Sequence, residues 1–158
     1  MKGDTGVKLQ YTHCRLGSLE RNCGTILTSK CEPSLLQEEV VDELVILIAK
    51  FEEVVLKSYE ELEPCILTVY LFNLRYEIQT PRLKHFSQLS NYVQYVYYRN
   101  MHKFSFFFSN AINKAFNSLR VKDELPDVAS QRLLLFHVAR NILAQGMKLL
   151  GLIPLEEM

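Results

Sequence analysis

The stretch RLLLFHVARNILAQGMKLLGLIPLEEM, residues 132–158, decides the fold class of this chain. Its apolar residues recur every three or four positions, which predicts an amphipathic helix. Gly151 is expected to cap that helix at its C-terminus, and Pro154 prevents the helix from resuming. We therefore predict a long closing helix, followed by a short tail that ends on Met158.

The closing helix has two unlike faces. The apolar face, expected to pack inward, comprises Leu135, Val138, Ala139, Ile142, Gly146 and Leu149. The polar face comprises His137, Arg140, Asn141, Gln145 and Lys148. At about 1.5–3 kcal/mol for each fully buried large side chain, the apolar stripe is sufficient reason for the helix to dock. The polar face is either solvated or available to a partner, and its cations Arg140 and Lys148 are candidate binding residues.

Helical patterns occupy much of the remaining chain. Residues 7–20 are predicted to form a helix, and residues 21–37 form a linker because they are rich in turn residues. A long helix is predicted over residues 38–62. Further helices are expected to begin at Pro64 and Pro126, since proline is favoured in the first turn. Because little strand alternation is present, we predict an all-α fold.

Residues 75–108 have a different composition from the rest of the chain. Ten aromatic residues are interleaved with five basic residues, and the segment has one acidic residue. Such a pattern can form a stacking platform for single-stranded nucleic acid. The alternatives are a helical hairpin that packs its aromatic rings on the core, and an adventitious insertion that packs poorly. We favour the insertion, for a reason that depends on the family resemblance given below.

The overall charge and the motif content exclude several classes of function. Eighteen Lys and Arg residues balance eighteen Asp and Glu residues, so the net charge is zero. This balance argues weakly against a dedicated nucleic-acid binder, where a basic excess is usual, and it is compatible with a local basic face. No phosphate-binding loop, hydrolase motif or metalloprotease motif is present. We therefore predict that this chain alone has no catalytic residues and no cofactor.

The four cysteines also lack the spacing of a metal site. They form no CxxC pair, so we predict ordinary reduced thiols and no bound metal. No run of about twenty apolar residues is present, so no membrane span is expected. The first residues lack the pattern of a signal or transit peptide.

A second candidate surface lies in VKLQYTHCRL, residues 7–16. Lys8, Tyr11 and Arg15 are three and four positions apart, which places them on one helical face. A cation, a ring and a guanidinium can together contact phosphates and stack on a base. The alternative is an ordinary exposed helix face.

Three stretches resemble arginyl-tRNA synthetases, and they occur in the family's order. GDTGVKLQYTHCRLGSLE (3–20) resembles the segment that leaves the catalytic domain. FEEVVLKSYEELEPCILTVYLFNL (51–74) resembles the DALR anticodon-binding bundle, and residues 132–158 resemble the end of the same enzymes. The stretches SLRVKDELPDVASQRLLLF (118–136) and GMKLLGL (146–152) resemble the animal mitochondrial form of the enzyme more than other forms.

The resemblance implies a domain organisation. Residues 1–22 would be the C-terminal end of the catalytic domain, and residues 23–37 would be a linker. Residues 38–158 would form a DALR-type helical bundle, interrupted by the aromatic-rich insertion at 75–108. In the family, the helix before this segment runs directly into the one after it, which is why we favour an insertion.

The resemblance also implies a function. Members of the family join arginine to its tRNA with ATP and Mg²⁺, and the mitochondrial form acts in the mitochondrial matrix. Their HIGH- and KMSK-like signatures are absent from this sequence. The chain would therefore bind the anticodon stem-loop of tRNA-Arg as a monomer, without catalysis of its own and without DNA or membrane. The alternatives are a non-enzymatic tRNA-binding adaptor and a defective isoform that has no affinity for RNA.

The resemblance also implies which residues contact RNA, wherever a position of this sequence matches the family pattern. In the family, the helix that contains L-Q-Y lies beside the anticodon loop, where its tyrosines and arginine contact RNA, and the terminal methionine lies nearby. Tyr11, Arg15 and Met158 match this pattern, whereas Lys8 stands where many members have an aromatic ring. Glu157 replaces a residue that is often basic. The predicted tRNA-binding residues are therefore Lys8, Tyr11, Arg15, Arg140, Lys148 and Met158.

Overall fold

The computed structural model describes residues 5–77 and 119–158, and over these ranges it contains helices and no strand. Its elements are α1 (Gly6–Asn22), the 3₁₀ turn η1 (Pro33–Leu35), α2 (Glu39–Ala49), α3 (Phe51–Glu60), α4 (Pro64–Glu77) and α7 (Pro126–Leu149). The prediction of an all-α fold is confirmed. The predicted insertion lies outside the described residues, except for residues 75–77 at the end of α4.

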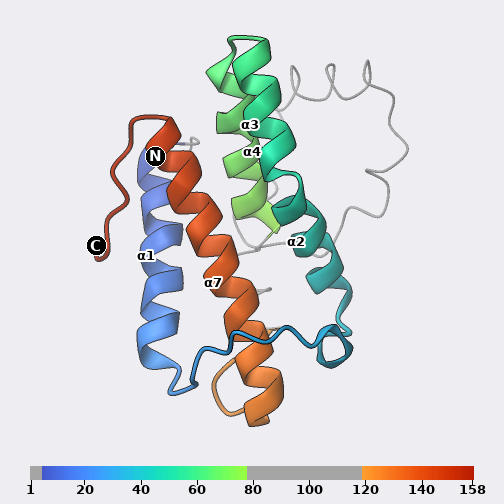
Figure 1. Cartoon of the computed structure of the whole chain (residues 1–158). Coiled ribbons are helices and arrows are strands. Elements are labelled where there is room, and N and C mark those ends of the chain that lie inside the picture. Colours follow the sequence, from blue (N-terminus) through green and yellow to red (C-terminus); the bar gives the residue numbers. More distant parts are fainter. Residues whose placement is uncertain (1–4, 78–118) are drawn as a thin grey trace.

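The long helix α7 forms the centre of the bundle. Figure 1 shows α1 alongside α7, and α2, α3 and α4 grouped beside α7 on its other side. α7 packs against α1, α2, α4 and η1, and these elements enclose one core. Fully buried side chains from α1, α4 and α7 meet in that core, among them Leu9, Leu16, Leu71, Leu74, Phe136, Leu143 and Met147.

The inward face of α7 is rotated slightly from the predicted one. Ala139 and Gly146 are buried as expected, but Leu149 is 58% exposed, so its assignment to the core is wrong. The buried series instead follows Phe136, Leu143 and Met147. This series follows the 3.6-residue period of a helix, so the next position after Met147 that faces the core is 150, and Leu149 faces outward.

The predicted helix over residues 38–62 is two helices that meet at Lys50. The hydroxyl of Tyr70, from α4, donates a hydrogen bond to the Leu47 carbonyl at 3.0 Å. A side chain that takes a carbonyl out of the helical ladder is a known cause of a break. The ring of Tyr70 also packs against that of Phe51, with the ring centres 5.9 Å apart. The break therefore depends on α4, whose residues lie outside the predicted helix 38–62.

The end of α7 has the predicted glycine cap. Gly151 has a φ of +77°, in the left-handed region that favours glycine. The amide of Leu152 donates to the Met147 carbonyl at 2.9 Å, and the amide of Gly151 donates to the Lys148 carbonyl at 3.0 Å. These two bonds define a Schellman cap. The cap reverses the chain and starts the tail, residues 152–158, on its way along α1.

A left-handed residue after α3 offers a test of local strain. Leu62 has a φ of +53° and is 81% exposed. Because a non-glycine residue in this conformation costs about 1–2 kcal/mol, we expect Leu62→Gly to raise the free energy of unfolding by about 0.5–1 kcal/mol. Urea denaturation would measure the change. Glu60→Gly, inside the last turn of α3, should instead lower stability. Equal losses for both variants would contradict this account.

Candidate nucleic-acid interface

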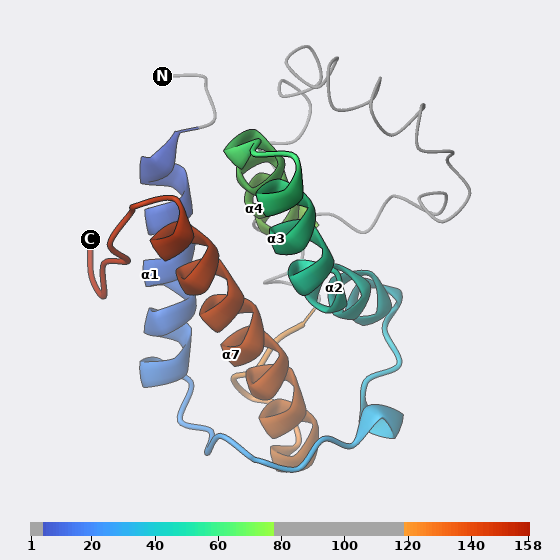
Figure 2. The ribbon, with the colours of Figure 1, turned by 45° about the horizontal axis from the view of Figure 1, so that its top comes forward.

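The tail lies along α1, so the last described residues contact the first helix. Figure 2 shows the tail beside α1, on the side away from α4. The Gln10 side chain makes two bonds to the tail: it donates to the Ile153 carbonyl at 2.7 Å and accepts from the Leu155 amide at 2.9 Å. Because one side-chain amide bonds the backbone of both Ile153 and Leu155, it fixes the position of the tail along the helix.

Two further side chains on α1 hold the Leu155 carbonyl. Nδ1 of His13 lies 2.8 Å from this oxygen, and the Cys14 thiol donates to it at 3.1 Å. Both side chains are buried. Burial raises the pKa of the Cys14 thiol, so the thiol keeps the proton that it donates. Gln10, His13 and Cys14 share one face of α1 because they are three and four positions apart.

An ion-pair network joins the tail, α1 and α7. The Arg140 guanidinium bonds Glu20 of α1 at 2.7 Å and Glu156 of the tail at 2.5 Å. It lies directly over Gly17, where an added Cβ would stand 2.9 Å from Nη2. Glu20 also bonds His137 at 3.1 Å. The absence of a side chain at Gly17 therefore gives Arg140 the room to cross α1.

The outer edge of α1 and the end of the tail enclose an open groove of about 510 Å³. Its lining residues are Tyr11, Cys14, Arg15, Ser18, Arg21, Asn22, Glu157 and Met158. Tyr11 is 51% exposed, which leaves much of its ring accessible. Arg21 pairs with Glu157 at 3.7 Å across the groove. The groove thus offers an exposed ring, a thioether and two guanidinium groups.

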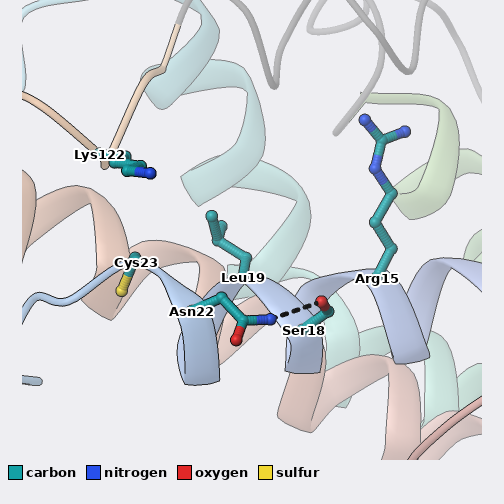
Figure 3. A pocket seen from close by; sticks show the side chains of 6 residues that line it. All are labelled: Arg15, Ser18, Leu19, Asn22, Cys23 and Lys122. Carbon is teal, nitrogen blue, oxygen red and sulfur yellow. Dashed lines mark hydrogen bonds between the residues drawn. The ribbon is translucent and has the colours of Figure 1, made fainter.

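A smaller depression of about 260 Å³ lies next to this groove and shares Arg15, Ser18 and Asn22 with it. Figure 3 shows Arg15 and Lys122 at opposite ends of this depression, with Leu19 between them. The Asn22 side chain donates to the Ser18 hydroxyl at 3.1 Å. Arg15 therefore borders both hollows.

The structure brings three of the six predicted site residues together. Tyr11, Arg15 and Met158 all line the groove, although Met158 is far from the other two in sequence. Lys8 lies one turn earlier on α1 and Lys148 is exposed in the last turn of α7, and neither is among the lining residues of these two hollows. Arg140 has a side chain only 14% exposed, and the ion-pair network holds it.

Sequence reasoning missed the residues that hold the tail. Gln10 and His13 stand inside the same short motif as Tyr11 and Arg15, but they face the tail instead of the groove. Glu20 and Gly17 complete this inner face of α1. The helical spacing separated the two faces of the motif. It could not show that the inner polar residues meet a chain segment about 140 positions away.

The buried imidazole makes the stability of this corner depend on pH. Burial lowers the pKa of His13 below its ordinary 6.5, and the charge of nearby Arg140 lowers the pKa further. A lowered folded-state pKa means that the unfolded chain takes up the proton first as pH falls. The free energy of unfolding should therefore be highest above about pH 6.5 and decrease as pH falls below it.

Urea denaturation at about pH 7.5 and pH 5.5 would measure this change. His13→Asn keeps an N–H donor near the position of Nδ1 but cannot be protonated in this range. The wild type should therefore lose more stability on acidification than His13→Asn. An equal loss in the two proteins would contradict a role for His13.

Within residues 5–77 and 119–158, no cluster of three or more His, Cys, Asp or Glu side chains could hold a metal ion. In the same part of the chain, no helix has both the length and the apolar character needed to cross a membrane.

The fold and the groove define a helical binding domain, and comparison with known proteins places it in a family. The model of the DALR anticodon binding domain matches residues 9–80 and 82–158. The chain therefore belongs to the DALR anticodon binding domain family. The two matched stretches meet inside the predicted insertion. The insertion itself, and the divisions predicted at residues 22 and 37, stay predictions.

Several curated proteins are similar to nearly the whole chain. The probable cytoplasmic arginine–tRNA ligase of Dictyostelium discoideum is 33% identical over 156 residues, which cover 99% of this chain and 21% of that protein. The probable mitochondrial arginine–tRNA ligase of Mus musculus is 34% identical over 153 residues, covering 97% of this chain and 21% of that protein. The chain thus spans about a fifth of the length of these relatives, which include both cytoplasmic and mitochondrial ligases.

A solved structure shares the fold. The arginyl-tRNA synthetase of Thermus thermophilus superimposes with a TM-score of 0.66 at 25% sequence identity. The match covers 99% of this chain and 22% of that one. The predicted resemblance to arginyl-tRNA synthetases is therefore confirmed.

Proposed function

We propose that this chain binds the anticodon loop of tRNA-Arg through the groove between α1 and the tail. The observation that carries the proposal is the meeting of Tyr11, Arg15 and Met158 in one open groove, in a chain of an anticodon-binding family. An exposed ring can stack on an unpaired base, and an arginine at the rim can contact a phosphate. The acidic Glu157 disfavours phosphate at the far edge, so the backbone of the loop would follow the Arg15 side.

We further propose that the domain serves an arginine–tRNA ligase that uses ATP and Mg²⁺ for aminoacylation. Support comes from the relatives, which carry that name and are about five times as long as this chain. The catalysis would belong to the parts of such a ligase that this chain does not match. Similarity to mitochondrial ligases supports a place in the mitochondrial matrix, although cytoplasmic ligases are equally similar.

The test is a binding titration of the purified chain against tRNA-Arg and against the same tRNA with a substituted anticodon, at two salt concentrations. We expect tighter binding of the true anticodon, with a preference that survives the higher salt. Phosphate attraction weakens steeply with salt, whereas recognition of bases does not. Equal binding of both tRNAs that disappears at high salt would contradict anticodon recognition and would leave only a weak basic surface.

A further inference from the structure

We propose that Gln10, His13 and Arg140 are positioning residues that hold the tail on α1, and that Arg140 contributes to RNA binding through Glu156 and not by touching RNA. This inference rests on the proposed function, because it concerns how the same groove is built. It separates polar residues that line the groove, such as Arg15, from Gln10, His13 and Arg140, which hold the tail without lining the groove; Cys14 and Arg21 do both.

The first argument is geometric. Glu157 and Met158 form one wall of the groove, and both belong to the tail. The wall has no helix or strand of its own to fix it, since α7 ends at Leu149. Its place is set by the side-chain bonds of Gln10 and His13 to residues 153 and 155 and by the ion pair of Arg140 with Glu156. Cys14 and Arg21, which also line the groove, add bonds to residues 155–157.

The second argument concerns the charge of Arg140. Its two terminal nitrogens bond Glu20 and Glu156, and its side chain is 14% exposed, against 69% for the side chain of Glu156. A phosphate would have to displace one of these carboxylates to reach the guanidinium. Arg15 lines the groove, whereas Arg140 is not one of its lining residues. Arg140 is therefore placed to fix the tail, and Arg15 is placed to contact a ligand.

The third argument is that the network is built into α1 on a single face. Gln10, His13, Gly17 and Glu20 are spaced by three or four residues, so they follow one side of the helix. Each contacts the tail or Arg140. Tyr11 and Arg15 lie on the neighbouring side and line the groove. The same short helix therefore presents a tail-holding face and a groove face.

The experiment combines amide exchange with tRNA binding in the full chain. The Leu155 amide donates to Gln10, so its hydrogen exchange reports directly whether the tail is in place. The variants are Arg140→Met and Glu156→Gln, which break the same ion pair from opposite sides. Lys148→Met is the matched control for the exchange rate only, because it removes one exposed cation from the same helix and takes part in none of the side-chain bonds that hold the tail.

We expect the Leu155 amide to exchange at least several-fold faster in Arg140→Met and Glu156→Gln than in the wild type and Lys148→Met. Affinity for tRNA-Arg should fall several-fold in both variants, while the slope of affinity against salt stays at the wild-type value. The double variant should bind about as weakly as the worse single variant, because both changes release the same tail.

Wild-type exchange of Leu155 in both variants would overturn the proposal. A salt slope reduced by about one in Arg140→Met alone would also overturn it, because that result signals a lost phosphate contact. If the wild type binds no tRNA, the proposed function fails and the positioning role in RNA binding fails with it. In that case the exchange rates would still decide whether Arg140 and Glu156 hold the tail.

Discussion

Replacing Tyr11 by alanine is expected to lower the affinity for tRNA-Arg by about tenfold or more, with little change in its dependence on salt. Stacking of one base on an aromatic side chain contributes about 1–3 kcal/mol, and each 1.4 kcal/mol is a factor of ten in affinity. The ring of Tyr11 stands at the groove with half of its surface exposed. Because stacking neutralises no phosphate, the number of released counterions should not change.

Two further variants make this prediction specific. Arg15→Ala should also weaken binding, but it should lower the slope of log affinity against log salt by about one, as expected when one phosphate contact is lost. Tyr59→Ala removes an equally large ring that is 76% exposed on α3, away from the groove. Its affinity should match that of the wild type. An equal loss for Tyr59→Ala and Tyr11→Ala would contradict the assignment of the groove.

Gly146→Leu is expected to lower the free energy of unfolding by about 3 kcal/mol. α4 and α7 approach so closely at this glycine that an added Cβ would stand 2.4 Å from Cδ2 of Leu71. Leu71 is fully buried, so it cannot swing into solvent to make room. Extra methylene groups in a packed core typically cost about 1–3 kcal/mol, and here the new atoms meet a side chain that has nowhere to move.

Urea denaturation would measure this loss, and the neighbouring position provides the control. Gln145→Leu adds the same side chain to the exposed side of α7 and should change stability by less than about 0.5 kcal/mol. Adding Leu71→Ala to Gly146→Leu should recover part of the loss, since the smaller side chain leaves room for the new one. Equal stability of Gly146→Leu and Gln145→Leu would show that the two helices are not closely packed at this point.

Local signals in the sequence were enough to predict the helices that begin or end at strong markers. Pro64 and Pro126 start α4 and α7, and Gly151 caps α7, because each of these residues has a conformational preference that needs no partner. The break at Lys50 could not be predicted in this way. It depends on a hydroxyl from Tyr70, twenty-three positions from the carbonyl that it bonds.

Groove residues that lie on the same helix could be predicted from their spacing in the sequence. Tyr11 and Arg15 share a face by spacing alone, and the family pattern added Met158. The partners of the polar residues on the neighbouring face were not predictable, because Gln10 and Arg140 make bonds to a tail that has no periodic pattern. For the same reason, Arg140 looked like a free cation on a helix surface, although the fold surrounds it with two carboxylates.

The docking of the tail on α1 has a consequence for how the protein is made. The bonds that set the groove join residues that are 143 and 145 positions apart. Closing so long a loop carries an entropic cost, which is met only when the intervening core has already brought the two ends together. A chain still under synthesis could form α1 and expose Tyr11 early, yet it would have no groove until Met158 had been added. Loss of residues 152–158 would therefore leave every fully buried side chain in place and remove one wall of the groove.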